Sequence, residues 1–444
     1  MNNDLDAATA NRRRFLKLTG SAVATAGVVG LTGQAAWAQG AAPSPGMAAT
    51  PARELPAAVK LPPMQEDKSE KAQMPVQLGK DGRLGLAIVG LGRLSLEEIM
   101  PALATSKRCR VTALVSGDPA KARQVAAMYD VPESHLYNYE TFDQLRDNPD
   151  VHAVYIVLPN ALHKEFTVRA AHAGKHVLCE KPMATSVADC QAMIAACKAA
   201  DRRLMIAYRI QYEPLDRQVK DWVRNRAALG QIKLITMSNC QNQSKQNTRQ
   251  WRHIKALAGG GALPDIGLYC LNTSRFLLGE EPVEVQASLY STPGDPRFTE
   301  VEEAILWQMR FPGGTRVQCN ASYGTFTSKH YRVVGDSGWA NMDPAFAYRG
   351  LQLKRSRIAS DTSEFIAPGI EQISPPEKNQ FALEMDHFAD CVANGKQPWT
   401  PGEEGLQDQR IMEAIYQSAH SGKPVELPTV NGLDAFRGTP PSPS

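Results

Sequence analysis

From residue 84 onward, short apolar runs alternate with stretches whose apolar positions recur with a helical period. The short runs predict buried strands, and the stretches between them predict helices that cover a sheet. Because this alternation continues to residue 208, it predicts a parallel, doubly wound α/β sheet. The predicted strands are residues 84–90, 110–116, 153–159, 176–181 and 203–208, and the predicted helices are residues 95–106, 118–129, 164–174 and 186–200.

After about residue 209 the apolar runs become longer and alternate more regularly with polar residues. This pattern predicts a second, α+β domain with a large open, mostly antiparallel sheet. The sequence FPGGT lies between two such runs and is a hairpin turn signal. Strands are expected at residues 231–239, 283–291, within 304–324 and at 329–335, and a helix over residues 379–395 should end at Gly395.

The first 38 residues contain the three parts of a twin-arginine (Tat) export signal. Arg12 and Arg13 open the run RRRFLK, a weakly apolar stretch covers residues 18–36, and the small-residue site AWA ends at Ala38. The apolar stretch is too rich in Gly, Ala and Thr to anchor a protein in a membrane. We therefore expect cleavage after Ala38 and export of the folded protein by the Tat translocase to the periplasm. A disordered basic tail is the alternative.

Residues 39–82 are rich in Pro and Ala and predict an extended arm. The arm could be a simple linker, or it could wrap a neighbouring subunit or cover a cofactor; its composition favours neither. The predicted organisation is a signal peptide at 1–38, the arm at 39–82, a dinucleotide-binding domain at 83–208, a substrate and oligomerisation domain at 209–428, and a tail at 429–444.

Composition and charge exclude some functions. The chain has 444 residues, 43% of them hydrophobic, and a formal net charge of +3. A charge so near balance predicts neither a nucleic-acid nor a membrane partner. The eight cysteines form no CxxC pair and no cluster with histidines, so we expect buried free thiols and no metal site.

The sequence VGLGRLS at residues 89–95 follows a predicted strand and opens a predicted helix. Gly90 would allow the tight turn, Gly92 would let the backbone approach a pyrophosphate at the helix N-terminus, and Ser95 replaces the third glycine of the usual motif. The alternative is an ordinary strand–helix turn. The position of the motif in the chain favours a dinucleotide site.

The end of the second predicted strand bears on the choice of cofactor. Many NAD sites have an acidic residue there, whereas this chain has Ser116, Gly117 and, one turn onward, Lys121. A hydroxyl, a glycine amide and a cation suit a 2′-phosphate, which favours NADP. Asp118 argues against this unless it begins the helix before Pro119, and Lys121 could be a solvated helix charge.

Candidate catalytic residues lie in two separate segments. Lys181 ends a predicted parallel strand, where open α/β sheets bind ligands, and its bond to Pro182 could be cis. Asp265 and Tyr269 lie four residues apart, so a helix would place them on one face. A tyrosine hydroxyl can act as a general acid or base beside a cation, here Lys181, while Asp265 would orient the substrate. Alternatively, Tyr269 is a half-buried helix tyrosine and Asp265 a carboxylate at a helix N-terminus.

Several motifs together resemble those of the Gfo/Idh/MocA oxidoreductases, and within them the glucose–fructose oxidoreductase branch. The resemblance extends over about residues 84–428 and implies a Rossmann domain followed by an α/β domain with a large open sheet. The motifs are VGLG, LPNALH (158–163), CEKPMATSVADC (179–190), QWR (250–252), GGGALPDIGLY (259–269) and PGEEGLQD (401–408).

The resemblance implies roles for individual residues. Lys181, Asp265 and Tyr269 match the catalytic positions, with tyrosine where most relatives have histidine. His163 is implied on the cofactor side, although it could be a loop histidine satisfied by its surroundings. The implied NADP-binding residues are Gly90, Leu91, Gly92, Arg93, Leu94, Ser116, Gly117, Lys121, Leu158, Pro159, Asn160, His163, Glu180, Lys181, Arg209, Trp251 and Arg252.

The resemblance and the export signal together imply a reaction. Because NADP is not supplied in the periplasm, a tightly bound cofactor would have to be reduced by one sugar and reoxidised by another. We therefore expect ping-pong hydride transfer from an aldose, which becomes a lactone, to a second sugar, which becomes a polyol, in a homodimer or homotetramer. The alternatives are an aldose dehydrogenase or reductase with exchanging cofactor, an NAD-dependent glycoside hydrolase, and a non-enzymatic sugar- or nucleotide-binding protein.

Overall fold

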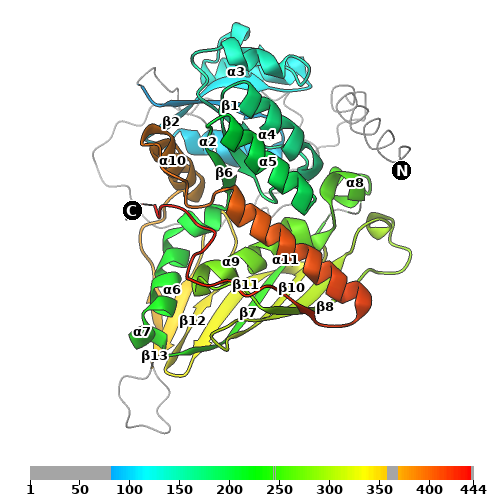
Figure 1. The fold of residues 1–444 in the computed structure, drawn as a ribbon, viewed down its shortest axis with the longest axis vertical. Coiled ribbons are helices and arrows are strands. Elements are labelled where there is room, and N and C mark those ends of the chain that lie inside the picture. Colours follow the sequence, from blue (N-terminus) through cyan, green and yellow to red (C-terminus); the bar gives the residue numbers. More distant parts are fainter. Residues whose placement is uncertain (1–81, 244, 246, 358–368, 442–444) are drawn as a thin grey trace, which may run out of the picture.

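A computed structural model describes residues 82–243, 245, 247–357 and 369–441, which form two sheets flanked by helices (Figure 1). The predicted signal peptide and almost all of the predicted arm lie outside the described residues. Among the described residues no helix is both long enough and apolar enough to cross a bilayer.

The first sheet contains only parallel strands in the order β3-β2-β1-β4-β5-β6. The chain order reverses beside β1, which is where open α/β sheets bind ligands. The strands are β1 Leu84–Val89, β2 Cys109–Val115, β3 Leu136–Tyr137, β4 Ala153–Ile156, β5 His176–Glu180 and β6 Leu204–Ala207. The helices of this domain are α2 Met100–Leu103, α3 Pro119–Tyr129, α4 His163–His172 and α5 Val187–Ala199. The prediction of a doubly wound parallel sheet is confirmed.

The expected helix over residues 95–106 is divided. A π-helical turn, η1 Ser95–Ile99, leads into the short α2. Pro101 has no amide hydrogen to donate to the preceding turn, which explains why regular α-helical hydrogen bonding does not run through this segment. The two-residue strand β3 was not predicted, because its apolar run is too short to give a pattern.

The second sheet has nine strands in the order β14-β13-β12-β11-β7-β10-β9-β8-β15. Every pair is antiparallel except β10 with β7, so the predicted mostly antiparallel sheet is confirmed. FPGGT forms the turn between β9 and β10, as predicted. The strands are β7 Ile232–Asn242, β8 Glu284–Tyr290, β9 Ala304–Arg310, β10 Arg316–Ser322, β11 Gly324–Gly335, β12 Gly338–Met342, β13 Leu353–Arg357, β14 Glu371–Ile373 and β15 Val425–Glu426.

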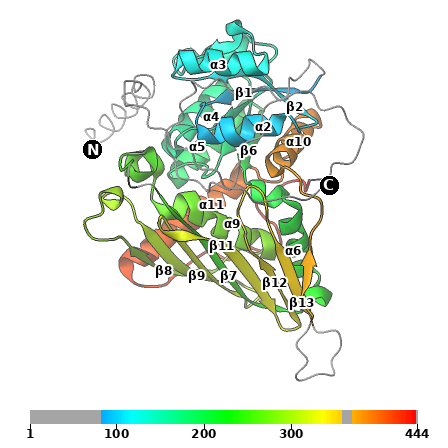
Figure 2. The same cartoon turned by 180° about the vertical axis from the view of Figure 1, so that it is seen from behind.

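Helices of the second half of the chain lie between this sheet and the first domain (Figures 1 and 2). These helices are α6 Pro214–Arg224, α9 Leu268–Leu278 and α11 Gly402–Ser421. The short helix α8 Lys255–Ala258 contacts the first domain, whereas the short helix α7 Arg226–Leu229 lies beside β12 at the end of the sheet far from that domain. The sheet's other face carries exposed side chains, among them Tyr290 and Leu306. One face of the sheet is therefore packed in the core and the other is open.

Helix α10, Gln380–Ala393, belongs by sequence to the second domain but packs against the first. Asp386 accepts hydrogen bonds from the Ser106 hydroxyl and the Arg108 amide, at 2.6 and 2.9 Å. As predicted, all eight cysteines are buried and free; the thiol of Cys109, for example, lies beneath α10 and contacts the Met385 carbonyl.

Candidate active site

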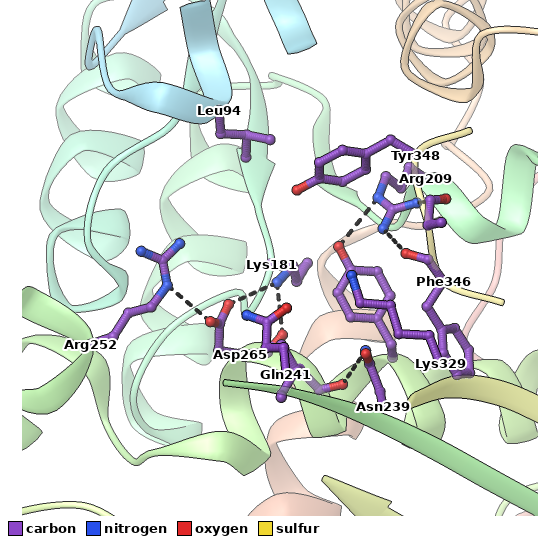
Figure 3. A pocket seen from close by; sticks show the side chains of 13 residues that line it. Leu94, Lys181, Arg209, Asn239, Gln241, Arg252, Asp265, Lys329, Phe346 and Tyr348 are labelled. Carbon is purple, nitrogen blue, oxygen red and sulfur yellow. Dashed lines mark hydrogen bonds and ion pairs between the residues drawn. The ribbon is translucent and has the colours of Figure 1, made fainter. Parts of the chain in front are cut away.

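A pocket lies between the two domains, where the carboxyl ends of β5 and β6 meet α9 and the second sheet (Figure 3). Strand β5 ends directly before Lys181, and β6 ends shortly before Arg209. The π-helical turn η7, Leu263–Gly267, carries Asp265, and Tyr269 follows in α9. The lining residues are Leu94, Lys181, Arg209, Asn239, Gln241, Arg252, Asp265, Ile266, Tyr269, Lys329, Phe346, Ala347 and Tyr348.

Lys181 has a side chain that is 11% exposed and is directed at the turn that carries Asp265. Its peptide bond to Pro182 is cis. Its ammonium donates to the Asp265 carbonyl at 2.8 Å and contacts the Asp265 carboxylate at 3.3 Å. The same ammonium lies 4.7 Å from the centre of the Tyr269 ring. Burial disfavours the charge on Lys181, but Tyr269 and Asp265 outweigh burial and raise the pKa of the lysine.

Asp265 is held by three donors. Besides Lys181, Arg252 approaches one carboxylate oxygen at 2.9 Å, and the Tyr323 hydroxyl donates to the same oxygen at 2.6 Å. Burial alone would raise the pKa of Asp265, but Arg252, Lys181 and Tyr323 together hold it well below its usual range. Asp265 is therefore ionised and fixes the positions of Lys181 and Arg252.

Sequence reasoning expects Lys181 as the cation beside Tyr269, and its ammonium does lie next to the tyrosine, over the ring. A second cation that was not expected in this role, Arg209, lies at the hydroxyl, to which its Nε donates at 3.2 Å. Arg209 is itself fixed by the Phe346 carbonyl and the Gln380 side chain, each at 2.6 Å. Tyr269 is thus flanked by two cations, one at its hydroxyl and one at its ring.

The loop after β1 has the conformation that a dinucleotide site requires. Gly90 has φ 98°, and a Cβ there would come within 2.4 Å of the Val157 carbonyl oxygen. Beside Gly92 the space is open, because a Cβ there would meet no atom within 4 Å. The Ser95 hydroxyl donates to the Gly90 carbonyl and ties the turn to the start of η1. This open space at the start of a helical segment fits the pyrophosphate of a nicotinamide dinucleotide.

The end of β2 presents a hydroxyl rather than a carboxylate. The Ser116 hydroxyl accepts a hydrogen bond from the Asp118 amide at 3.1 Å. Asp118 caps α3, accepting from the Lys121 amide at 3.0 Å, with Pro119 as the first helical residue. The interpretation of Asp118 as a helix-start residue is confirmed.

His163 is a structural residue. Its ring is completely buried, and its two nitrogens lie 2.8 Å from the Leu158 carbonyl and 2.9 Å from the Pro182 carbonyl. The expectation that its side chain lies on the cofactor side is therefore wrong. The ring instead joins the LPNALH loop to the turn that carries Lys181.

Three further residues that the resemblance assigned to cofactor binding lie behind the lining of the pocket or at its edge. Asn160 is buried and donates to the Ala258 carbonyl at 2.8 Å. Glu180 is buried and accepts a hydrogen bond from the Tyr155 hydroxyl at 2.9 Å. Trp251 lies beside Arg252, and the Arg252 guanidinium is 4.4 Å from the centre of the Trp251 indole ring.

Sequence reasoning missed several residues of the pocket. Asn239 and Gln241 lie two apart in β7, and the alternation of the strand could have placed them on one face. Tyr323, Lys329, Phe346 and Tyr348 offered no comparable signal, because they reach the site only through the pairing of distant strands and loops. Among the described residues, no group of three His, Cys, Asp or Glu side chains could ligate a metal ion.

Comparisons with known proteins agree with this architecture. Residues 84–208 match an oxidoreductase family described by its NAD-binding Rossmann fold, and residues 225–427 match the C-terminal alpha/beta domain of the same family, Gfo/Idh/MocA. The chain is 34% identical over 357 residues to D-xylose 1-dehydrogenase [NADP(+)] of Haloarcula marismortui, covering 79% of this chain and 95% of that protein.

Two solved structures show the same two-domain fold. An aldose–aldose oxidoreductase from Caulobacter crescentus, complexed with glycerol, is 44% identical with a TM-score of 0.74, and the match covers 78% of this chain and 100% of that one. A 3-ketoreductase from Actinomadura kijaniata, in complex with NADP and TDP-benzene, is 25% identical with a TM-score of 0.66, covering 76% and 98%.

Proposed function

This chain belongs to the Gfo/Idh/MocA family of oxidoreductases, and we propose that it oxidises the anomeric carbon of an aldose to a lactone with tightly bound NADP. The observation that carries the proposal is the environment of Tyr269. Its hydroxyl accepts a hydrogen bond from Arg209 in a pocket that also contains Lys181 and adjoins the dinucleotide loop. The names of the xylose dehydrogenase and the aldose–aldose oxidoreductase support an aldose as substrate.

Tyr269 is the general base for the anomeric hydroxyl. The base is the ionised form of Tyr269, and as it takes the proton the negative charge passes from the tyrosine oxygen to the sugar oxygen, where Arg209 and Lys181 stabilise it. Asp265 does not transfer a proton; it keeps Lys181 and Arg252 in place. Gly90, Gly92 and the start of η1 would hold the pyrophosphate of a nicotinamide dinucleotide, which would supply the hydride acceptor. In the reverse direction, Tyr269 protonates a carbonyl oxygen.

The end of β2 supports NADP over NAD. Ser116 stands where a carboxylate would bind the ribose hydroxyls, and Asp118 is occupied in capping α3. Lys121 lies in the first turn of α3, where its charge suits a 2′-phosphate. The relative that uses NADP(+) and the one solved with NADP agree with this assignment.

A second sugar is the oxidant that completes the cycle. The twin-arginine segment of the sequence supports export to the periplasm, where NADP is not supplied, so the cofactor has to remain bound and be reoxidised in place. The carbonyl of the second sugar is then reduced to a polyol in a ping-pong cycle. The relative named aldose–aldose oxidoreductase supports this scheme. The exposed side chains on the open face of the second sheet support the assembly of the chain into a homodimer or homotetramer. The relative named a xylose dehydrogenase favours the second candidate, an aldose dehydrogenase whose NADP exchanges.

Replacement of Tyr269 tests the proposal. Tyr269→Phe should keep the fold and the bound dinucleotide but lower aldose oxidation by about 10²- to 10⁴-fold. Tyr290→Phe, on the open face of the sheet, is the matched control and should oxidise aldoses at the wild-type rate. A near-normal rate in Tyr269→Phe would remove the tyrosine from the reaction.

A further inference from the structure

We infer that the pocket recognises an aldose that carries a carboxylate, a uronic acid, and that Lys329 and Asn239 form the subsite for this end of the sugar. The inference rests on the proposed function, because it specifies the class of aldose that the same pocket binds. It arises from the wall of the pocket opposite Lys181, which none of the sequence motifs includes.

Lys329 and Asn239 face each other across two strands. Strands β11 and β7 are antiparallel, and Lys329 pairs directly with Asn239 in their register. Directly opposed residues project to the same face of a sheet, and here that face is the pocket. Gln241, two residues further along β7, lies on the same face. Figure 3 shows the three side chains on the sheet side of the pocket, with Lys181 and Asp265 beyond them.

Both residues have unused hydrogen-bonding capacity. Asn239 is 2% exposed, and its amide nitrogen donates to the Ile266 carbonyl at 3.0 Å. Its amide oxygen is buried and accepts no hydrogen bond from the described part of the chain. The Lys329 ammonium likewise has no ion pair or hydrogen bond with any described residue. A ligand that offers a hydroxyl to Asn239 and an anion to Lys329 would satisfy both groups.

The ionisable groups lining the pocket are mostly cations. Lys181, Arg209, Arg252 and Lys329 are opposed by one lining carboxylate, Asp265, whose oxygens already contact Lys181, Arg252 and Tyr323. Two carboxyls lie behind the lining, Glu180 and Glu384, and burial raises the pKa of both, which favours their neutral forms. A pocket with this excess of positive charge binds an anionic sugar better than a neutral sugar of the same shape.

A uronic acid combines the two features that the pocket requires. Its anomeric carbon can react at Tyr269, while its carboxylate and the neighbouring hydroxyl lie at the other end of the sugar. The carboxylate would accept from Lys329, and the hydroxyl would donate to the free amide oxygen of Asn239.

The test compares two sugars that differ only at carbon 6. D-Glucose and D-glucuronate are titrated by calorimetry into the purified full-length protein with its cofactor bound. Glucuronate should bind about tenfold more tightly than glucose, the gain expected of one charge-assisted hydrogen bond. Lys329→Met should abolish this difference and leave glucose binding within about twofold, and Lys329→Arg should restore it. Lys354→Met, an exposed lysine of β13, removes the same charge away from the pocket and should change neither affinity.

Each other outcome overturns the inference or separates it from the proposed function. Equal binding of the two sugars, or an equal loss of both in Lys329→Met, shows that Lys329 does not recognise a carboxylate. Tighter binding of D-glucose 6-phosphate than of glucuronate assigns the subsite to a phosphate and overturns the carboxylate. Tight glucuronate binding without oxidation of any aldose contradicts the proposed function and supports the inference. Oxidation of neutral aldoses without a preference for glucuronate supports the proposed function and contradicts the inference.

Discussion

Tyr269 contacts two cations through different parts of its side chain. Arg209 donates to the hydroxyl, and Lys181 lies over the ring. The sequence motifs identified Lys181, Asp265 and Tyr269 as one site, but they could not assign the cation at the hydroxyl. That assignment depends on Phe346 and Gln380, which fix Arg209 from 137 and 171 residues further along the chain. No local pattern contains such contacts.

The buried side chain of Glu384 should make the stability of the protein depend on pH. It is completely buried, and neither carboxyl oxygen has a hydrogen-bond partner in the described part of the chain. Burial and the neighbouring Glu180 raise its pKa well above the ordinary value, although Arg209 opposes them. The folded protein therefore binds this proton more tightly than the unfolded chain. The contribution of Glu384 to the free energy of unfolding is therefore largest below the ordinary glutamate pKa of about 4.3. It falls as the pH rises toward the pKa of Glu384 in the folded protein.

Glu384→Gln removes this titration. Compared with wild type, the variant should become increasingly stable as the pH rises above the ordinary glutamate pKa of about 4.3, and the gain should vanish below it. Thermal unfolding midpoints measured across this range check the prediction. The exposed Glu140→Gln is the control and should follow the wild-type profile. Parallel curves for Glu384→Gln and wild type would show that Glu384 does not titrate differently in the folded state.

The period of the apolar positions predicts the central strands of both sheets well. Each predicted strand of the first domain has a counterpart, and FPGGT forms the β9–β10 turn. Strand order was not predictable, because the parallel pairing of β10 with β7 joins segments about eighty residues apart that no local pattern relates. Similarly, periodicity predicted α10 but not that it packs against the first domain.

The C-terminal segment also differs from a simple tail. The Arg437 side chain is completely buried, at 2.7 Å from the equally buried side chain of Glu404 in α11, and it also pairs with Asp434 at 2.9 Å. Asp434 in turn contacts Lys220 and Arg224 of α6. The segment therefore joins α6 to α11 across the helical layer. Its sequence, rich in Gly, Pro and Ser, gave no sign of this packing.

Removal of Arg437 should destabilise the protein strongly. Arg437→Met leaves Glu404 buried with Arg275 as its remaining cation, and breaking a buried pair in this way typically costs about 3–5 kcal/mol. Denaturant unfolding of the mature protein measures the loss. Arg316→Met, an exposed position of β10, is the control for loss of an arginine. A loss below about 1 kcal/mol in Arg437→Met would mean that the segment does not hold α11.

The groups that line the pocket come from both domains. Arg349, three residues beyond the lining residue Phe346, forms an ion pair with the buried Glu98 of η1 at 2.7 Å. This contact ties the dinucleotide loop to the segment that fixes Arg209. The two domains thus contribute to one pocket, and in the proposed reaction the first domain would hold the cofactor and the second the sugar.

In the proposed cycle, one retained NADP serves two sugars in this site. The most direct test is to purify the protein without added cofactor and record the absorbance of reduced nicotinamide before an aldose is added, after it is added, and after a ketose follows. We predict that the band of the bound cofactor rises with the aldose and falls again with the ketose. Protein that emerges without dinucleotide and requires added NADP for every turnover would contradict the claim.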